Sequence, residues 1–566
     1  FTKYTSRQLQ LLDPLYNAAM KLLSKAAIYT TTPIFYVNAK PHLGHFYTMT
    51  LADVRNRWCK FNNRPTFFTT GTDEHGLKVQ NAALKAGVEP KPFCDNLANK
   101  FKDLAKLGNI NYDRFIRTTD EDHYAAVHHF WNVVKENGYI YKGQHSGWYS
   151  ISDETFYPET DIQEAVDEKS GKKIMVSKET DSEVVYQTEE NYFFKLSEFQ
   201  QQVLDFIKSN PTFIQPQKYY DFIVNELESR KLPDLSVSRP STRLQWGITV
   251  PGDDSQKIYV WFDALINYLT SEGYPTAIEM PRPTHLVGKD IIKFHCIYWP
   301  AFLLAAKVQM PQQVFVHGHW LMGGRKMSKS RGNVADPIEL AGKYDSDSLR
   351  LFIMKYSVLD TDGDFSEERL NTLRSEFIDK FCNLMIRSLS KNFNIKRALE
   401  RLDNSSYEDL LEEVHDAEFK ATLLDVRDTV DALPKDIDES ITNFDMHKAV
   451  QKIFNMGPLV NGLFDKYEPW TLKVKKDDNE TVSATKQLRQ DLIIFTALDS
   501  LRVILLVLQS IIPAYTGTLL TRLQVDPAKR TVEYSKVGSD LTYGKNATFK
   551  KGEEVPLKKI NFALEK

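Results

Sequence analysis

The pattern that most constrains this fold is a rhythm of strands and helices that stops and later resumes. From residue 28 to residue 138, apolar β-branched runs alternate with helical patterns, which is typical of a parallel sheet covered by helices. Three further strand-like runs follow much later, at residues 257–262, 284–288 and 313–318. A sheet that is interrupted and resumed implies an insertion. We therefore predict an α/β fold of Rossmann type, with halves at residues 28–138 and 246–365 and a connective domain inserted at residues 139–245.

Beyond the resumed sheet the pattern is helical. Long segments with a 3.6-residue period fill residues 366–525, which predicts an all-α domain. Residues 526–566 are polar and basic, with glycines as breakers, and we expect a loosely attached C-terminal extension. Residues 1–27 are basic, poor in acids and amphipathic. This N-terminal segment fits a mitochondrial transit peptide or its remnant, and equally a surface helix packed on the sheet domain.

Composition limits the class of function. The 566 residues allow about three to four domains, and the balance of 72 basic against 75 acidic side chains gives a net charge of −3. Any RNA surface must therefore be a local patch. The four cysteines are widely separated, which predicts a reducing compartment, no disulfide framework and no zinc knuckle; they are Cys59, Cys94, Cys296 and Cys382. The longest apolar stretch, near residues 501–512, is too short to cross a membrane, which takes about 20 residues.

A glycine-containing turn follows the first predicted strand. Residues 28–37 lead into His42-Leu43-Gly44-His45, and a helical pattern begins directly afterwards. Such a turn points free backbone N–H groups and the positive end of the helix dipole at an anion. The sequence therefore predicts a phosphate site at this turn.

A second motif lies about 280 residues downstream, in the run 324–333 (GRKMSKSRGN). It places Lys326, Lys329 and two serines within five residues between glycines. Alone, such a run is most often a solvated basic loop. In this order with the His-x-Gly-His turn, it resembles the signature pair of the class I aminoacyl-tRNA synthetases.

Four further blocks narrow the resemblance to the methionyl-tRNA synthetase family, over residues 28–525. They are residues 31–38 (TTPIFYVN), 71–76 (GTDEHG), 259–264 (YVWFDA) and 288–295 (GKDIIKFH). The size of the insertion agrees, because the leucine, isoleucine and valine enzymes carry a much larger editing domain there. Zinc-carrying relatives have cysteine pairs where this chain has Ser150 and Asp153, so no structural zinc is expected and the mitochondrial form is favoured.

The resemblance implies activation of L-methionine by ATP, with Mg²⁺ accompanying the nucleotide, and transfer of the product to initiator and elongator methionine tRNA. It places the enzyme in the mitochondrial matrix, with the cytoplasm as the alternative. We expect a monomer without membrane association, since no appended dimerisation module is visible. The helical region would bind the anticodon.

The resemblance also implies site residues. For ATP binding these are His42, Gly44, His45, Gly288, Asp290, His317, Trp320, Lys326 and Lys329, of which His42, His45, Lys326 and Lys329 are the catalytic set. For methionine binding they are Ile34, Tyr36, Asp73, Trp261, Ala264, Leu265, Tyr268, Ile291 and His295. Asp73 suits the ammonium group because an ionised carboxylate only accepts hydrogen bonds. Some relatives have proline where Leu265 stands.

For the anticodon the implied residues are Asn383, Arg387 and Trp470. Asn383 and Arg387 are four residues apart and share a helix face, and Trp470 would stack on a splayed base. Plainer interpretations exist: Asp73 as a helix N-cap, Trp470 as a buried packing residue, and the pocket residues as ordinary core. Two other functions also stay open, a different nucleotidyltransferase with the His-x-Gly-His turn and an RNA-binding organellar splicing helper.

Overall fold

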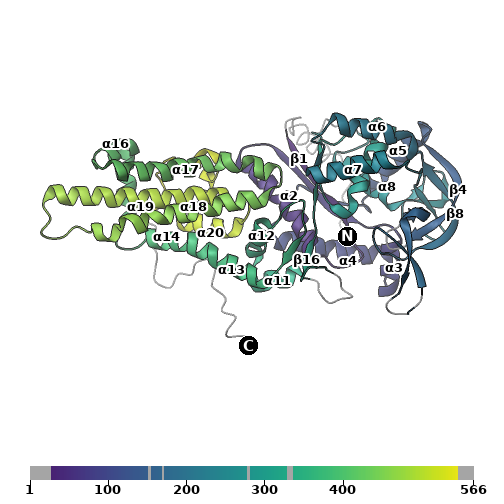
Figure 1. Ribbon diagram of the computed structural model, residues 1–566, viewed down its shortest axis with the longest axis horizontal. Helices are drawn as coiled ribbons and strands as arrows, with labels where there is room; N and C mark the ends of the chain where they lie inside the picture. Colours follow the sequence, from purple (N-terminus) through teal and green to yellow (C-terminus); the bar gives the residue numbers. More distant parts are fainter. Residues whose placement is uncertain are drawn as a thin grey trace, which may run out of the picture. The chain divides into compact units, whose positions relative to one another are not determined.

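The computed structural model describes residues 27–150, 155–167, 171, 173–276, 281–327 and 335–545 (Figure 1). Within these residues the chain divides into two compact units. The first comprises the described parts of Phe1–Ala52, Pro65–Lys106 and Ile110–His319. The second comprises those of Asp53–Arg64, Leu107–Asn109 and Trp320–Lys566.

A six-stranded parallel sheet forms the centre of the first unit. Its order is β3-β2-β1-β14-β15-β9, and every neighbouring pair is parallel. The strands are β1 (Ile28–Tyr36), β2 (Thr66–Asp73), β3 (Arg114–Arg117), β9 (Ile214–Gln215), β14 (Thr284–Gly288) and β15 (Gln313–His317). β2 and β14 are buried along their whole length, as expected for strands covered on both faces. The predicted α/β fold is confirmed.

The strand order reverses between β1 and β14. β1 pairs with β2 on one side and with β14 on the other, although about 250 residues separate β1 from β14. In open parallel sheets, ligands bind beyond the carboxyl ends of the strands at such a reversal. The outermost strand, β9, comes from residues that the sequence pattern places in the insertion, because a two-residue strand leaves no readable alternation.

Helices cover this sheet and share its core. They are α2 (Leu43–Phe61, in this unit up to Ala52), α3 (Leu77–Ala86), α4 (Pro90–Leu107), α5 (Glu121–Glu136), α8 (Val260–Leu265), α9 (Asn267–Ser271) and α10 (Trp299–Ala306). α5 buries Val127, Phe130, Trp131 and Val134 at helical spacing, and its acids lie in the first turn where the helix dipole favours them. A π-helical turn at Phe294–Tyr298 precedes α10, and single π turns often occur at functional sites.

The connective segment and the residues just after it, up to Ile258, form three small antiparallel sheets and two helices. β4 (Ile140–Ser150), β5 (Thr155–Tyr157), β8 (Val185–Phe194) and β10 (Leu235–Ser236) form the first. β11 (Ser238–Pro240), β12 (Thr249–Val250) and β13 (Asp253–Ile258) form the second, and β6 (Ile162–Val166) pairs with β7 (Lys173–Ser177) in the third. The helices are α6 (Leu196–Ser209) and α7 (Gln217–Ser229), whose buried faces join the core of the sheet domain. The run 257–262, expected to resume the central sheet, instead ends β13 and begins α8, so that expectation is wrong.

The described part of the second unit is mainly helical. Its short strands are β16 (Trp320–Met322), β17 (Arg325–Lys326) and β18 (Gly363–Phe365). Its α-helices are α11 (Pro337–Tyr344), α12 (Ser346–Lys355), α13 (Glu367–Phe377), α14 (Asn383–Ser388), α15 (Ile395–Asn404), α16 (Tyr407–Glu412), α17 (Ala417–Thr442), α18 (Met446–Tyr467), α19 (Glu480–Leu508) and α20 (Pro513–Arg522). The predicted helical C-terminal region is confirmed.

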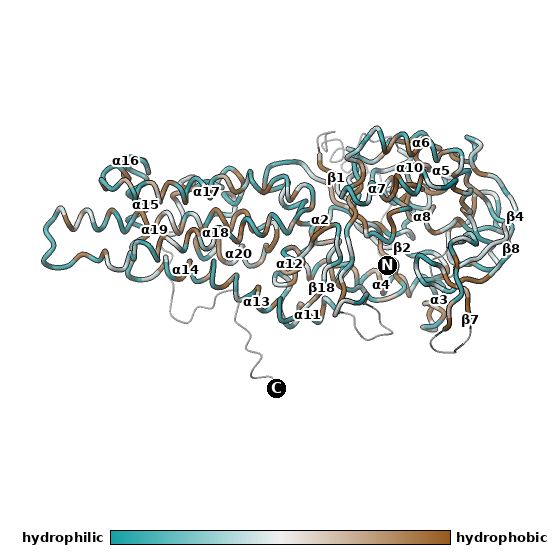
Figure 2. The backbone as a smooth tube through the Cα atoms, in the orientation of Figure 1, coloured by the Kyte–Doolittle hydropathy of each residue, from teal (hydrophilic) through white to brown (hydrophobic). Residues whose placement is uncertain are grey.

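The long helices pack around α19. Brown and teal turns alternate along α17 and α18 in Figure 2, as expected for helices with one buried stripe. α19 is buried continuously from Ile493 to Leu508, so it is the central helix of this unit. Of the helices that the structure describes, none combines the length and apolarity that a bilayer crossing requires.

Residues 526–545 are attached more firmly than their polar composition suggests. Arg502, buried on α19, donates hydrogen bonds to the carbonyl oxygens of Tyr534 and Lys536 at 2.6 and 2.8 Å. Tyr543 is completely buried. This part of the expected loose extension is therefore anchored through backbone carbonyls, which leave no pattern in the sequence, whereas residues 546–566 lie outside the described residues.

Candidate active site

The His-x-Gly-His motif starts α2: His42 directly precedes the helix, and Leu43, Gly44 and His45 are its first three residues. The imidazole rings of His42 and His45 stack with centroids 3.8 Å apart. The backbone N–H of His42 donates to His45 Nδ1, and that of Gly44 donates to His42 Nδ1, both at 3.1 Å. A neutral ring whose Nδ1 accepts carries its proton on Nε2, so both rings can donate to an anion. A Cβ at Gly44 would lie 2.9 Å from His42 Cε1, so a larger residue would displace the His42 ring.

Three of the predicted nucleoside-side residues gather at the carboxyl ends of β14 and β15. A Cβ at Gly288 would lie 2.7 Å from the Asp290 carboxylate and 3.7 Å from the His317 ring. His317 Nδ1 donates to the carbonyl of Gly318 at 2.7 Å, and its Nε2 lies 3.0 Å from the Thr48 hydroxyl on α2. Burial lowers the pKa of His317 to about 4, so this ring is neutral and joins the His-x-Gly-His helix to the sheet.

The remaining predicted ATP residues belong to the second unit. Trp320 begins β16 and is buried, with its ring centroid 5.6 Å from that of Phe352. Lys326 ends β17, but its side chain and the whole of Lys329 lie outside the described residues. Their roles stay predictions.

Asp73 ends β2 and is 2% exposed. In the pairing of β2 with β1, Asp73 lies opposite Tyr36. Asp73 is therefore next to one of the aromatic residues predicted to line the methionine pocket. The helix that follows begins at Leu77 with Gly76 as its N-cap residue, so the interpretation of Asp73 as an N-cap is wrong. The Asp73 carboxyl group is thus buried at the carboxyl edge of the sheet.

The predicted side-chain pocket assembles around Trp261 on α8. The Tyr36 ring meets Trp261 edge to face at 6.3 Å, and the His295 ring does so at the same distance. Phe294 stacks on Trp261 at 3.8 Å. Sequence reasoning missed Phe294, whose only signal was its place directly before His295. Together these rings form an aromatic wall.

His295 lies in the π-helical turn and its tautomer is fixed. Its Nδ1 lies 3.0 Å from the carbonyl oxygen of Ile291 and so donates there, while Nε2 accepts from the Tyr268 hydroxyl at 2.7 Å. Burial lowers the pKa of His295 to about 4, so the ring stays neutral. Ile34 and Ile291 are partly exposed, whereas Ala264 and Leu265 are buried.

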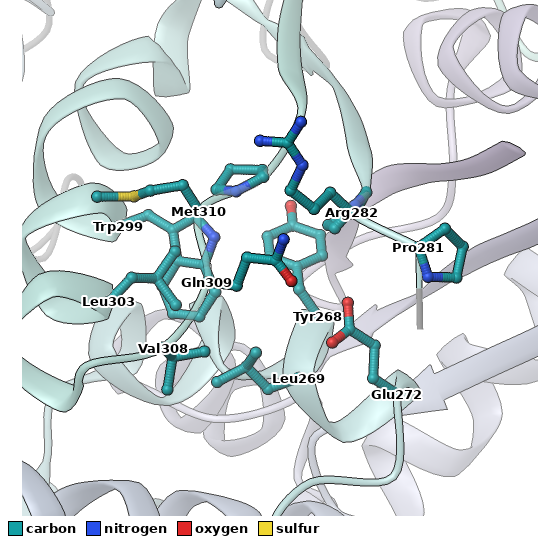
Figure 3. Close-up of a pocket in the computed structure, with 12 residues that line it drawn as sticks. Tyr268, Leu269, Glu272, Pro281, Arg282, Trp299, Leu303, Val308, Gln309 and Met310 are labelled. Carbon is teal, nitrogen blue, oxygen red and sulfur yellow. The ribbon is translucent and has the colours of Figure 1, made fainter. Parts of the chain in front are cut away.

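A small cavity of about 40 Å³ lies beside Tyr268 (Figure 3). The Tyr268 ring, Trp299 and Leu303 line it together with Glu272, Arg282 and Met310. It is large enough for a water molecule but far too small for an amino acid. The Tyr268 ring therefore packs against Trp299, while its hydroxyl bonds to His295.

The predicted anticodon residues all lie in the second unit. Asn383 begins α14 and donates to Asp379 at 3.1 Å. Arg387 lies 3.3 Å from the Asn461 amide oxygen and 4.6 Å above the Phe464 ring, both on α18. Trp470 is 45% exposed, so its interpretation as a buried packing residue is wrong.

The connective segment is held together by apolar and cationic contacts. Tyr157, Ile162 and Val184 form a small cluster against which Trp148 and Met175 pack. Arg243 lies 4.1 Å above the Tyr149 ring. Ser150 is buried at the end of β4, and Asp153 lies outside the described residues. Within the described ranges, no group of three or more His, Cys, Asp or Glu side chains is arranged to hold a metal ion.

Comparison with known proteins agrees with this geometry. Residues 28–389 match the family model for class I tRNA synthetases (M). The chain therefore belongs to the class I aminoacyl-tRNA synthetases. It is 45% identical to the mitochondrial methionine–tRNA ligase of Candida albicans, over 96% of this chain and 97% of that protein. The mitochondrial methionine–tRNA ligase of Saccharomyces cerevisiae is 44% identical with the same coverage.

A solved structure extends the likeness to three dimensions. Mycobacterium tuberculosis methionyl-tRNA synthetase in complex with methionyl-adenylate superimposes with a TM-score of 0.82 at 33% identity. The match covers 94% of this chain and all of that one. Within its class, the chain belongs to the methionyl-tRNA synthetase family.

Proposed function

We propose that this protein joins L-methionine to the 3′ end of methionine tRNA in two steps, through methionyl-adenylate. The observation that carries the proposal is the pairing, along one sheet edge, of the His42–His45 turn with Asp73 and the Trp261 aromatic wall. The first offers donors for phosphate, and the second offers an anion and aromatic rings for an ammonium group and a thioether. No covalent enzyme intermediate is required.

In the first step the methionine carboxylate attacks the α-phosphorus of ATP in line and pyrophosphate leaves. Phosphoryl transfer of this kind depends on positioning and charge stabilisation. His42 and His45 donate through Nε2 to phosphate oxygens, and the start of α2 adds its dipole. We assign Lys326 and Lys329 to the departing pyrophosphate because of the motif they belong to. Gly288, Asp290, His317 and Trp320 are assigned to the nucleoside side.

Methionine is held by its two ends. Asp73 accepts from the ammonium group, and the side chain lies against Tyr36, Trp261 and Phe294. The Tyr268 hydroxyl donates its hydrogen bond to His295 Nε2, so it has no proton left to offer the methionine sulfur. The sulfur instead meets polarisable aromatic rings and the lone pairs of the Tyr268 oxygen. A methylene difference in such a pocket is worth only ~1–3 kcal/mol, so shape must supply the discrimination against leucine.

The finer assignments complete the proposal. Mg²⁺ bound to ATP takes its ligands mainly from phosphate oxygens and water, so the protein needs to add at most one or two carboxylates. Asn383, Arg387 and Trp470 bind the anticodon of initiator and elongator methionine tRNA. The protein acts as a monomer. Its place is the mitochondrial matrix, an assignment supported by the mitochondrial names of its yeast relatives.

Methionine-dependent exchange of pyrophosphate into ATP tests this proposal. The purified chain should catalyse the exchange with methionine and not with leucine or isoleucine. It should then charge methionine tRNA when tRNA is added. A splicing helper without synthetase activity gives no exchange, and a nucleotidyltransferase with another substrate gives none that depends on methionine; either result would refute the proposal.

A further inference from the structure

A buried carboxylate bonded to two imidazoles lies in the first unit, outside the residues assigned above. Asp263 Oδ2 is 2.7 Å from His75 Nδ1, and Asp263 Oδ1 is 2.7 Å from His123 Nε2. The three side chains are at most 1% exposed. Charge-assisted hydrogen bonds that are shielded from water in this way are strong, and removing one partner is costly.

The outer nitrogen of each ring is also bonded. His75 Nε2 lies 3.1 Å from the Tyr124 hydroxyl, and His123 Nδ1 lies 2.9 Å from that of Thr270. A neutral ring directs its N–H at the carboxylate and accepts from the hydroxyl. Burial by itself would raise the pKa of Asp263, but the two imidazoles outweigh it and hold the pKa below its usual value. The carboxylate is therefore ionised at neutral pH.

The cluster joins three separate elements. His75 lies two residues after Asp73, just beyond the end of β2. Asp263 lies on α8 between Trp261 and Ala264, and His123 lies in the first turn of α5. α8 has only 6 residues, too few for a helix to be stable by its own hydrogen bonds. Only Ile266 separates it from the similarly short α9, so tertiary contacts contribute to its position, and the two bonds of Asp263 are among them.

We propose that Asp263 is a positioning residue for the methionine site, with His75 and His123 as its anchors. The inference rests on the proposed function of that site. By tying α8 to the turn after β2, Asp263 fixes the spacing between the ammonium acceptor Asp73 and the aromatic wall at Trp261. That spacing sets which amino acid can contact both ends of the pocket at once. Asp263 itself contacts neither substrate.

The first test is Asp263→Asn in the full chain, assayed by pyrophosphate exchange. The KM for methionine should rise about tenfold to a hundredfold, the scale for losing a charge-assisted hydrogen bond. The KM for ATP should stay near wild type, because the His42–His45 turn is held by its own backbone bonds. Asp113→Asn is the matched control: its carboxylate accepts from the backbone of Phe68 near the start of β2, and neither KM should change.

Conservative variants keep the test decisive if Asp263→Asn folds poorly. His75→Asn puts an amide nitrogen where Nδ1 lies, and His123→Gln puts one where Nε2 lies, so each retains a donor to Asp263. Both should bind methionine more tightly than His75→Leu and His123→Leu do, at similar melting temperatures. A purely structural role would instead follow side-chain volume and melting temperature.

The possible failures are distinguishable. An inactive wild-type protein would refute the proposed function itself. An active wild type, together with equal rises of both KM values in Asp263→Asn or with no change in either, would overturn the positioning role alone. Equal methionine affinity in the donor-retaining and leucine variants would also overturn it.

Discussion

Truncation of Trp470 should separate tRNA recognition from amino-acid activation. The ring is 45% exposed, in a short 3₁₀ turn (Pro469–Leu472) whose Pro469 carbonyl accepts a hydrogen bond from Gln490 at 2.9 Å. Trp470→Ala therefore leaves that bond intact and opens little of the core. Stacking of one base on an aromatic ring is worth about 1–3 kcal/mol, which corresponds to about fivefold to 150-fold in tRNA affinity.

The assay compares aminoacylation with exchange. In Trp470→Ala, kcat/KM for tRNA should fall by that factor, while pyrophosphate exchange without tRNA and the melting temperature stay close to wild type. Phe222→Ala is a matched control, because Phe222 on α7 is also 45% exposed but lies in the first unit. If Trp470→Ala lowers exchange and melting temperature together while its folded fraction charges tRNA normally, the anticodon assignment is wrong.

Four further outcomes are expected. Lys329→Ala should lower the adenylation rate by ~10²–10³ with little change in methionine affinity, and near-normal exchange would remove this lysine from the mechanism. Asp73→Asn should weaken methionine binding by ~1.5–3 kcal/mol and spare ATP, whereas equal loss of both ligands would indicate a structural role. Burial raises the pKa of Asp347 to about 6, above its ordinary value. Its ionisation therefore lowers the free energy of unfolding as the pH rises from the ordinary carboxyl pKa through about 6. Asp347→Asn should therefore melt higher than wild type at pH 7 and alike below pH 4, and a constant difference at all pH values would contradict this. Elemental analysis of the pure protein should find no stoichiometric zinc, and one zinc per chain would overturn the expectation.

The strand and helix pattern predicted the architecture because long periodic segments carry it. β1 and α2 are each long enough to show their period, and Gly44 in the first turn of α2 lies close to the His42 ring. Shorter features left no such trace. β9 has two residues, and its membership of the central sheet depends on pairing with β15, about 100 residues away.

The site was predictable only as far as motifs reached. Asp73, Trp261 and His295 lie in recognisable blocks, but their mutual geometry depends on side chains without a motif of their own. His123 gave no signal, because a histidine near a helix start is usually a surface residue. His123 is completely buried because α5 contacts α8 through its bond to Asp263. This is a tertiary contact, which the local sequence pattern does not show.

The pairing of β1 with β14 fixes the two sides of the site independently of the connective segment. β1 carries Tyr36 towards Asp73 on β2, and β14 leads into the turn that carries His295. Because β1 and β14 are hydrogen-bonded neighbours, their relative position is fixed by the sheet ladder and not by the chain between them. The chain between them needs only to start at β1 and return at β14. A connective segment held by its own small apolar cluster is therefore compatible with an intact site at this sheet edge.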